Sequence, residues 1–158
     1  MMNEALDLEI GQKVLEVGAG SGWHASTVAE IVAPSNKPKK LWGHVYTVEI
    51  IPELASFARR NIERAGYGER VTVIYGDGST GYPKEAPYDR ILVTAAAPSL
   101  PEPIIEQLRI GGKVVIPIGS LTFFQRLKRF TKVDGKVLEE NLTDVAFVPL
   151  VGKYGHKI

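Results

Sequence analysis

Residues 13–26 read KVLEVGAGSGWHAS, and this stretch decides the fold. Its short apolar run is typical of a strand buried on both faces of a parallel sheet. Glycines at positions 18, 20 and 22 then allow a tight main-chain turn and a close approach to a ligand. A helix is expected from about Gly22 to Val32. The stretch therefore predicts a strand, a glycine turn and a helix whose free N–H groups face that turn.

The alternation of strand and helix continues to about residue 120. Pro52 and Pro101 stand where a first-turn proline belongs in two further helices, which end near Gly66 and Leu108. Parallel strands need crossover helices, and those crossovers are right-handed. We therefore predict a doubly wound α/β sheet, Rossmann-like and mostly parallel, in a single domain over residues 1–158. The further strands are expected over residues 44–50, 70–76, 88–96 and 111–119.

Residues 123–150 break this rhythm and predict two long strands. The dipeptide Asp134-Gly135 between them is a strong hairpin signal. We expect a C-terminal antiparallel hairpin at one edge of the sheet, with the order of its two strands left open. Segment 125–136 carries five basic residues against one acid. A grip on acidic peptide or RNA is one interpretation; lysines that discourage edge-to-edge pairing are the one we favour.

The composition excludes several classes of chemistry. The chain has 158 residues, a formal net charge of +1 and no cysteine, so disulfides, thiolate catalysis and cysteine-ligated metals are excluded. His24, His44 and His156 show no metal-ligand spacing, and we expect no metal. No apolar run is long enough to cross a bilayer, and the acidic start does not read as a signal peptide. We expect a cytoplasmic protein without a membrane or nucleic-acid partner.

Two acids at predicted strand ends accompany the glycine turn. Glu49 ends the second strand, where a carboxylate can accept hydrogen bonds from both ribose hydroxyls, and Asp77 follows the third. A bare strand-to-helix turn, a solvated Glu49 and a simple Asp77-Gly78 turn are the alternatives without a ligand. A dinucleotide fits less well, because Trp23 occupies the place where glycine or alanine would be wanted. We interpret the set as a site for a nucleoside-type cofactor, S-adenosylmethionine.

Beyond the glycine turn, specific motifs follow in order. They are VLEVGAGSG, VEI, YGDGSTGY, APYDRILVTAAAP, IGGKVVIPIG and VAFVPLVGKYG. From about Leu6 to Gly155 the chain resembles the protein-L-isoaspartate O-methyltransferases. The combination of GDGSTGY with APYDRILVTAAAP and FVPLVG is far more specific than the glycine turn alone.

The resemblance implies an S-adenosylmethionine-dependent methyltransferase fold, with S-adenosylhomocysteine as product. It implies methylation of the free carboxyl of L-isoaspartyl residues in damaged proteins and peptides, as a repair step. Thr94 to Ala96 would form the floor beneath the transferred methyl group, and the folded-back tail would bring substrate-side residues to the site. No catalytic residue is identified. The cofactor-binding residues are expected to be Gly18, Ala19, Gly20, Ser21, Gly22, Glu49, Ile50, Asp77, Gly78, Thr94 and Ala95, and the substrate-side residues Ala96, Val151 and His156.

The resemblance also implies a Thr-x-Ser-x-Pro motif, ahead of the region that matches Leu6, whose serine lies at the active site. The 158 residues contain no such motif. Two alternatives to the carboxyl methyltransferase therefore stay open. One is a methyltransferase of RNA or a small molecule; the other is a shortened form that binds the cofactor without turnover.

Overall fold

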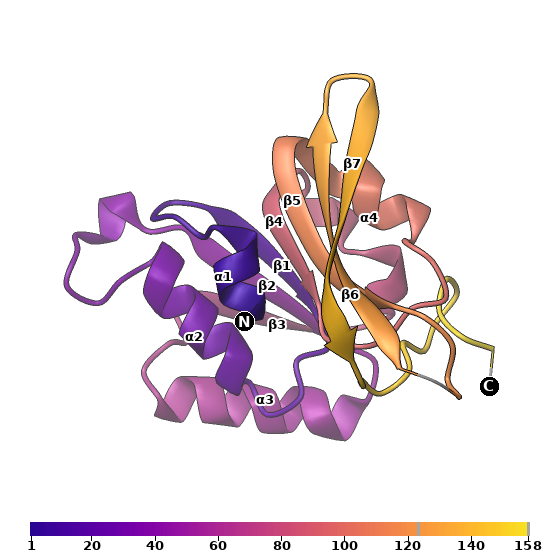
Figure 1. Cartoon of the computed structure of the whole chain (residues 1–158). Coiled ribbons are helices and arrows are strands. Elements are labelled where there is room, and N and C mark those ends of the chain that lie inside the picture. The colour runs from indigo at the N-terminus through magenta and orange to yellow at the C-terminus, as the bar shows by residue number, and fades with distance from the viewer. Residues whose placement is uncertain (123, 158) are drawn as a thin grey trace.

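The protein, described by a computed structural model over residues 1–122 and 124–157, folds around a seven-stranded sheet (Figure 1). The strand order is β3-β2-β1-β4-β5-β6-β7. The first five strands are parallel, and the last two are antiparallel to their neighbours. The predicted doubly wound, mostly parallel sheet is thus confirmed. The strands are β1 (Lys13–Val17), β2 (His44–Glu49), β3 (Val71–Tyr75), β4 (Tyr88–Val93), β5 (Leu108–Ile118), β6 (Gln125–Val133) and β7 (Lys136–Val145).

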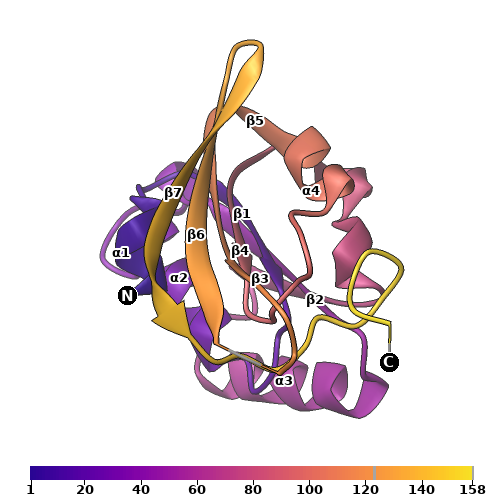
Figure 2. The same ribbon diagram turned by 45° about the vertical axis from the view of Figure 1, so that its right-hand side comes forward.

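Helices cover both faces of the sheet, because successive strand residues point to opposite sides. Val14 and Leu92 pack under three helices, α1 (Met2–Leu6), α2 (Trp23–Val32) and α3 (Pro52–Arg64). Their neighbours Leu15 and Ile91 pack on the other face, under α4 (Glu102–Gln107). Figure 2 shows α1 and α2 on one side and α4 on the other. Among the helices that the structure describes, none is long and apolar enough to span a bilayer.

In the parallel part of the sheet, two predicted boundaries differ from the structure by three residues, and the others by at most one. β4 ends at Val93 rather than at residue 96, because Ala96 exchanges its backbone hydrogen bonds with the C-terminal tail. The Thr94 hydroxyl lies 3.0 Å from the Val17 carbonyl, and Ala96 bridges to Pro149. β5 begins at Leu108 instead of residue 111, since that residue already pairs with the start of β4.

The C-terminal hairpin forms with its turn at Asp134-Gly135, as predicted. β6 pairs with β5, and β7 is the outer strand. The cross-strand register places acids of β7 against the basic residues of β6. The resulting ion pairs are Arg126–Asp144 at 3.2 Å, Lys128–Glu139 at 3.2 Å and Arg129–Glu140 at 2.8 Å.

Candidate cofactor site

The glycine turn follows β1, and its three glycines all have positive φ. A Cβ on Gly18 would lie 2.5 Å from the Thr94 hydroxyl oxygen, and one on Gly22 would lie 2.9 Å from the Ile62 side chain. These two glycines are therefore required by packing within the protein. A Cβ on Gly20 would meet nothing within 4 Å. Gly20 is thus the glycine of the turn that leaves open space for a ligand.

The carboxylate of Glu49 turns toward this glycine rather than into solvent. It is 7% exposed, and its Oε1 accepts a hydrogen bond from the Gly20 N–H at 3.0 Å. Its Oε2 accepts a second one from the Ile51 N–H at 3.2 Å. The alternative of a solvated strand-end glutamate is therefore wrong. The end of β2 carries a fixed acceptor beside the open main chain of the turn.

Asp77 and Gly78 lie at the next strand end. The Asp77 Oδ1 accepts hydrogen bonds from the Ser79 N–H at 2.9 Å and the Ser79 hydroxyl at 2.7 Å. Its Oδ2 accepts one from the Lys153 N–H at 2.9 Å. Burial opposes ionisation, but these hydrogen bonds together lower the pKa of Asp77. The half-buried carboxylate is therefore charged and anchors the C-terminal tail.

That tail folds back against the strand ends. The Leu150 N–H donates to the Ala96 carbonyl at 2.8 Å, and the His156 N–H donates to the Leu150 carbonyl at 2.9 Å. Val151 and His156 form an isolated bridge. Figure 2 shows the tail, in yellow, looping back near α3. The tail therefore brings its residues to the same edge of the sheet as Asp77.

These elements enclose an apolar cleft of about 400 Å³, within the range of small-molecule sites. Five of the predicted residues line it directly: Gly18, Ile50, Gly78, Ala95 and Val151. The remaining lining residues are Val17, Val48, Ile51, Leu54 and Val148 to Leu150.

The other predicted residues lie around the cleft or beyond it. Ala96 is fully buried beneath the tail, and His156 is held within the tail. Ser21 and Gly22 line a second cavity of about 520 Å³, between α2 and α3. Thr94 supports the turn, because its hydroxyl lies 2.9 Å from the Gly18 carbonyl. Ala19 is buried within the turn.

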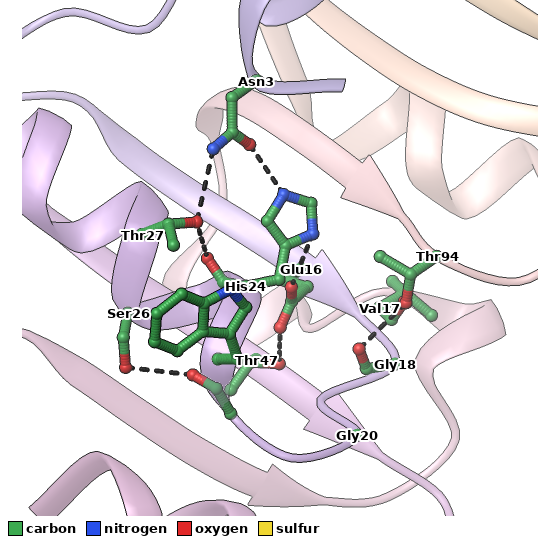
Figure 3. A network of polar contacts seen from close by, with 12 residues as sticks. Asn3, Glu16, Val17, Gly18, Gly20, His24, Ser26, Thr27, Thr47 and Thr94 are labelled. Carbon is green, nitrogen blue, oxygen red and sulfur yellow. Dashed lines mark hydrogen bonds and ion pairs between the residues drawn. The ribbon is translucent and has the colours of Figure 1, made fainter. Parts of the chain in front are cut away.

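Glu16, a fully buried acid in the middle of β1, was not among the predicted site residues. Its Oε1 accepts a hydrogen bond from the Thr47 hydroxyl at 2.5 Å, and its Oε2 lies 3.7 Å from the His24 Nδ1 (Figure 3). Burial raises the pKa of Glu16 to about 8. Burial also lowers the pKa of His24, so the imidazole is neutral at pH 7. A glutamate inside the run KVLEV was the signal that could have drawn attention to this site.

Within residues 1–122 and 124–157, no cluster of three or more histidine, aspartate or glutamate side chains is arranged to hold a metal ion.

Comparison with known proteins gives a consistent family. The family model for protein-L-isoaspartate(D-aspartate) O-methyltransferase matches residues 1–155. The protein-L-isoaspartate O-methyltransferase of Hyperthermus butylicus is 64% identical over 98% of this chain and 64% of its own length. The enzyme of that name from Korarchaeum cryptofilum is 56% identical, over 98% of this chain and 71% of its own length. The chain therefore spans about two thirds of these relatives.

Solved structures agree with the sequence comparison. A structure named protein-L-isoaspartate O-methyltransferase superimposes with a TM-score of 0.86 at 34% identity, covering 98% of this chain and 46% of its own. A Plasmodium falciparum protein of the same name, in complex with S-adenosyl-L-homocysteine, has a TM-score of 0.80 at 27% identity, covering 95% of this chain and 69% of its own. With the family model matching nearly every residue, the chain belongs to the protein-L-isoaspartate(D-aspartate) O-methyltransferase family.

Proposed function

We propose that this chain binds S-adenosylmethionine in the cleft at the end of β1, β2 and β4. We further propose that it transfers the methyl group to the free carboxyl of L-isoaspartyl residues in proteins. The observation that carries the proposal is the pairing of Gly20 with Glu49. Gly20 leaves free space beside its main chain. Glu49 supplies a carboxylate that is held in place because its Oε1 accepts the Gly20 N–H at 3.0 Å.

The residues that line the cleft and those beside it, which include Gly20, Glu49 and Asp77, would divide the cofactor between them. The turn from Gly18 to Gly22 would hold the methionine part, and Glu49 the ribose hydroxyls. Ile50 lines the cleft and would pack against the adenine, whose edge Asp77 and Gly78 would meet. A carboxylate offers roughly four acceptor sites. Three of those on Asp77 are taken by Ser79 and Lys153, so one remains for an exocyclic amino group.

The acceptor side is formed by the end of β4 and the tail. Thr94 and Ala95 would lie beneath the methyl group, with Ala96, Val151 and His156 toward the substrate. Val151 is partly exposed and lines the cleft, so it can contact both the cofactor and an incoming peptide. Ala96 would act through the backbone, because it holds the tail by hydrogen bonds of 2.7 and 2.8 Å.

The chemistry requires alignment more than acid–base catalysis. The bound cofactor supplies an electrophilic methyl group on a sulfonium. An isoaspartyl carboxyl is already ionised at pH 7, so no general base is needed. The protein must hold the carboxylate in line and exclude water, which contributes roughly 7–11 kcal/mol in well-oriented reactions. The apolar side chains of Val17, Val48 and Leu54 provide such a dry wall.

The structure disfavours RNA as the acceptor. The basic hairpin was the feature that suggested it, and Arg126, Lys128 and Arg129 are each paired with an acid of β7. Lys132 donates to the carbonyls of Ile105 and Leu108, both at 2.9 Å. The basic side chains of this strand therefore bind to groups of the protein itself. The positive charge available for phosphate groups is smaller than the number of basic residues predicts.

Two measurements on the 158-residue chain test the proposal. Calorimetric titration with S-adenosylmethionine and S-adenosylhomocysteine measures cofactor binding. Labelled methyl transfer to an isoaspartyl peptide, against the same peptide with a normal aspartyl residue, measures the reaction. We expect binding of both ligands and base-labile label on the isoaspartyl peptide alone. Binding without any transfer would support the cofactor site and refute the activity of this chain, whereas absence of binding would refute both.

A further inference from the structure

Glu16 is a buried acid beneath the glycine turn that the proposed reaction does not use. It is 0% exposed, and its Oε2 has no hydrogen-bond partner in the structure. The other oxygen is satisfied by the Thr47 hydroxyl at 2.5 Å. A buried carboxylate oxygen without a partner is costly, whereas a protonated one can donate its hydrogen. The His24 Nδ1 on α2 lies 3.7 Å from this oxygen.

The hydrogen bonds around His24 determine which of its nitrogens carries the hydrogen. The Thr27 hydroxyl donates to the His24 carbonyl at 2.7 Å, so its oxygen is left to accept from the Asn3 side-chain amide at 3.3 Å. The Asn3 Oδ1 therefore faces the His24 Nε2, 2.7 Å away, as an acceptor. The Nε2 must therefore carry the hydrogen and donate it to Asn3. The Nδ1 then carries a lone pair, which is directed at Glu16. Figure 3 shows Asn3, His24 and Glu16 in a row from α1 to β1.

The Glu16 Oε2 and the His24 Nδ1 are therefore two hydrogen-bond acceptors that face each other, unless a proton lies between them. A hydrogen on the Glu16 Oε2 removes the conflict, and it leaves both the buried carboxyl and the partly buried imidazole neutral. The surroundings act in the same direction. Glu49 on β2 repels a negative charge on Glu16, and burial disfavours a positive charge on His24. The geometry thus points to one proton held by the pair.

We propose that Glu16 and His24 hold one exchangeable proton beneath the glycine turn, and that this proton leaves when the cationic methyl donor binds but stays when the neutral product binds. The inference rests on the proposed cofactor site. S-adenosylmethionine carries one more positive charge than S-adenosylhomocysteine, because only the former is a sulfonium. That charge favours the ionised carboxyl, and the released proton passes to the buffer. Glu16 and His24 would thereby help the protein to distinguish donor from product.

The direction of the pH effect follows from linkage. The free protein holds the proton below pH 8, and a bound cation lowers the pH at which it is lost. The affinity for the donor should therefore rise with pH up to about 8 and then level off. The affinity for the product should change much less. A charge interaction of this kind across a protein interior corresponds to roughly a fivefold rise in the donor-to-product affinity ratio between pH 6 and pH 8.5.

Calorimetry on the full chain tests the proposal. Each ligand is titrated at pH 7.5 in two buffers of different ionisation enthalpy, which gives the number of protons exchanged. We expect release with S-adenosylmethionine, near-zero exchange with S-adenosylhomocysteine, and no release in Glu16→Gln. Glu69→Gln removes an exposed carboxyl that pairs with Lys39 and should behave as the wild type. Carbon-13 NMR of the unliganded wild type should show one carboxyl that titrates above pH 7.

Each outcome decides the matter. Equal exchange with both ligands, no exchange in the wild type, or release that survives in Glu16→Gln would overturn the proton linkage while leaving the cofactor site intact. Binding of neither ligand at any pH would overturn the proposed function and the linkage together. If Glu16→Gln does not fold, the two-buffer comparison and the carboxyl titration of the wild type still decide, since neither needs the variant.

Discussion

The Glu49 carboxylate accepts a hydrogen bond from the Gly20 N–H at 3.0 Å, across the gap between the ends of β2 and β1. The two strands are neighbours in the sheet, with Val17 paired to Val48. Their tips are therefore held at a fixed separation by the parallel ladder. A ligand bound between them meets an acceptor and open main chain that are already in place, so little ordering is needed on binding.

Replacing Glu49 by glutamine should weaken binding of both S-adenosylmethionine and S-adenosylhomocysteine. The amide keeps one acceptor but loses the charge that strengthens hydrogen bonds to ribose hydroxyls, a loss of roughly tenfold in affinity. Calorimetric titration measures it. Glu53→Gln, an exposed acid in the first turn of α3, is the charge-matched control. Equal effects of the two substitutions would contradict a direct role for Glu49.

The substitutions Gly20→Ala and Gly18→Ala should have different effects. The first should mainly weaken ligand binding, and the second should mainly lower the stability of the fold. Gly20→Ala has no steric conflict within the protein, and its left-handed φ of 53° costs about 1 kcal/mol of stability. It should nevertheless bind the cofactor poorly, because the new methyl group enters the ligand's space. Gly18→Ala collides with the Thr94 hydroxyl and should lower the melting temperature more. Thermal melts and titrations of both variants check this, and a Gly20→Ala protein with full affinity would contradict it.

The substitution Asp77→Asn should loosen the C-terminal tail. Asp77 accepts the Lys153 N–H and supports Ser79, which in turn accepts the Tyr154 N–H at 3.0 Å. Losing the charge weakens this anchor, so trypsin should cleave after Lys153 severalfold faster than in the wild type. Mass spectrometry of timed digests follows the reaction. Asp134→Asn at the hairpin turn is the control, and identical digestion of the two variants would exclude the anchor.

The buried Glu16 should make the protein less stable as the pH rises. Burial raises its pKa to about 8 in the folded chain, from an ordinary value of 4.5. The unfolded chain loses the proton first, so the free energy of unfolding falls between about pH 4.5 and pH 8 and is then constant. Urea denaturation at pH 5.5 and pH 8.5 should show wild type losing roughly 1–3 kcal/mol relative to Glu16→Gln. Parallel pH profiles of the two proteins would refute the assignment.

The sheet was predictable because its signals are local. Apolar runs such as Lys13–Val17, first-turn Pro52 and the Asp134-Gly135 turn each act within a few residues. The boundaries that differed depend on distant partners. β4 ends at Val93 because the backbone of Ala96 forms its hydrogen bonds with the tail residues Val148 and Leu150, which lie more than fifty positions later in the chain. Such pairings have no signature in the residues on either side.

The site was predictable in part for the same reason. The glycine turn and Glu49 follow directly from strand ends, which parallel topology brings together. The role proposed for Glu16 depends on His24 and Asn3, which only the packing of α1 and α2 on β1 brings near it. The preference for a structural role of the basic hairpin agrees with the acids that the antiparallel register sets opposite its cations, although the sequence alone did not reveal which residues would pair.

The tail that closes the cleft has a practical consequence for experiments. Lys153 and Tyr154 of the tail bond to Asp77 and Ser79, so a label attached to this part of the tail would lie beside the cleft and disturb any titration. The turn at Asp134-Gly135 lies at the far tip of the hairpin (Figure 1). A fluorophore or surface-attachment group is better placed at this turn, where it would not contact a ligand bound in the cleft.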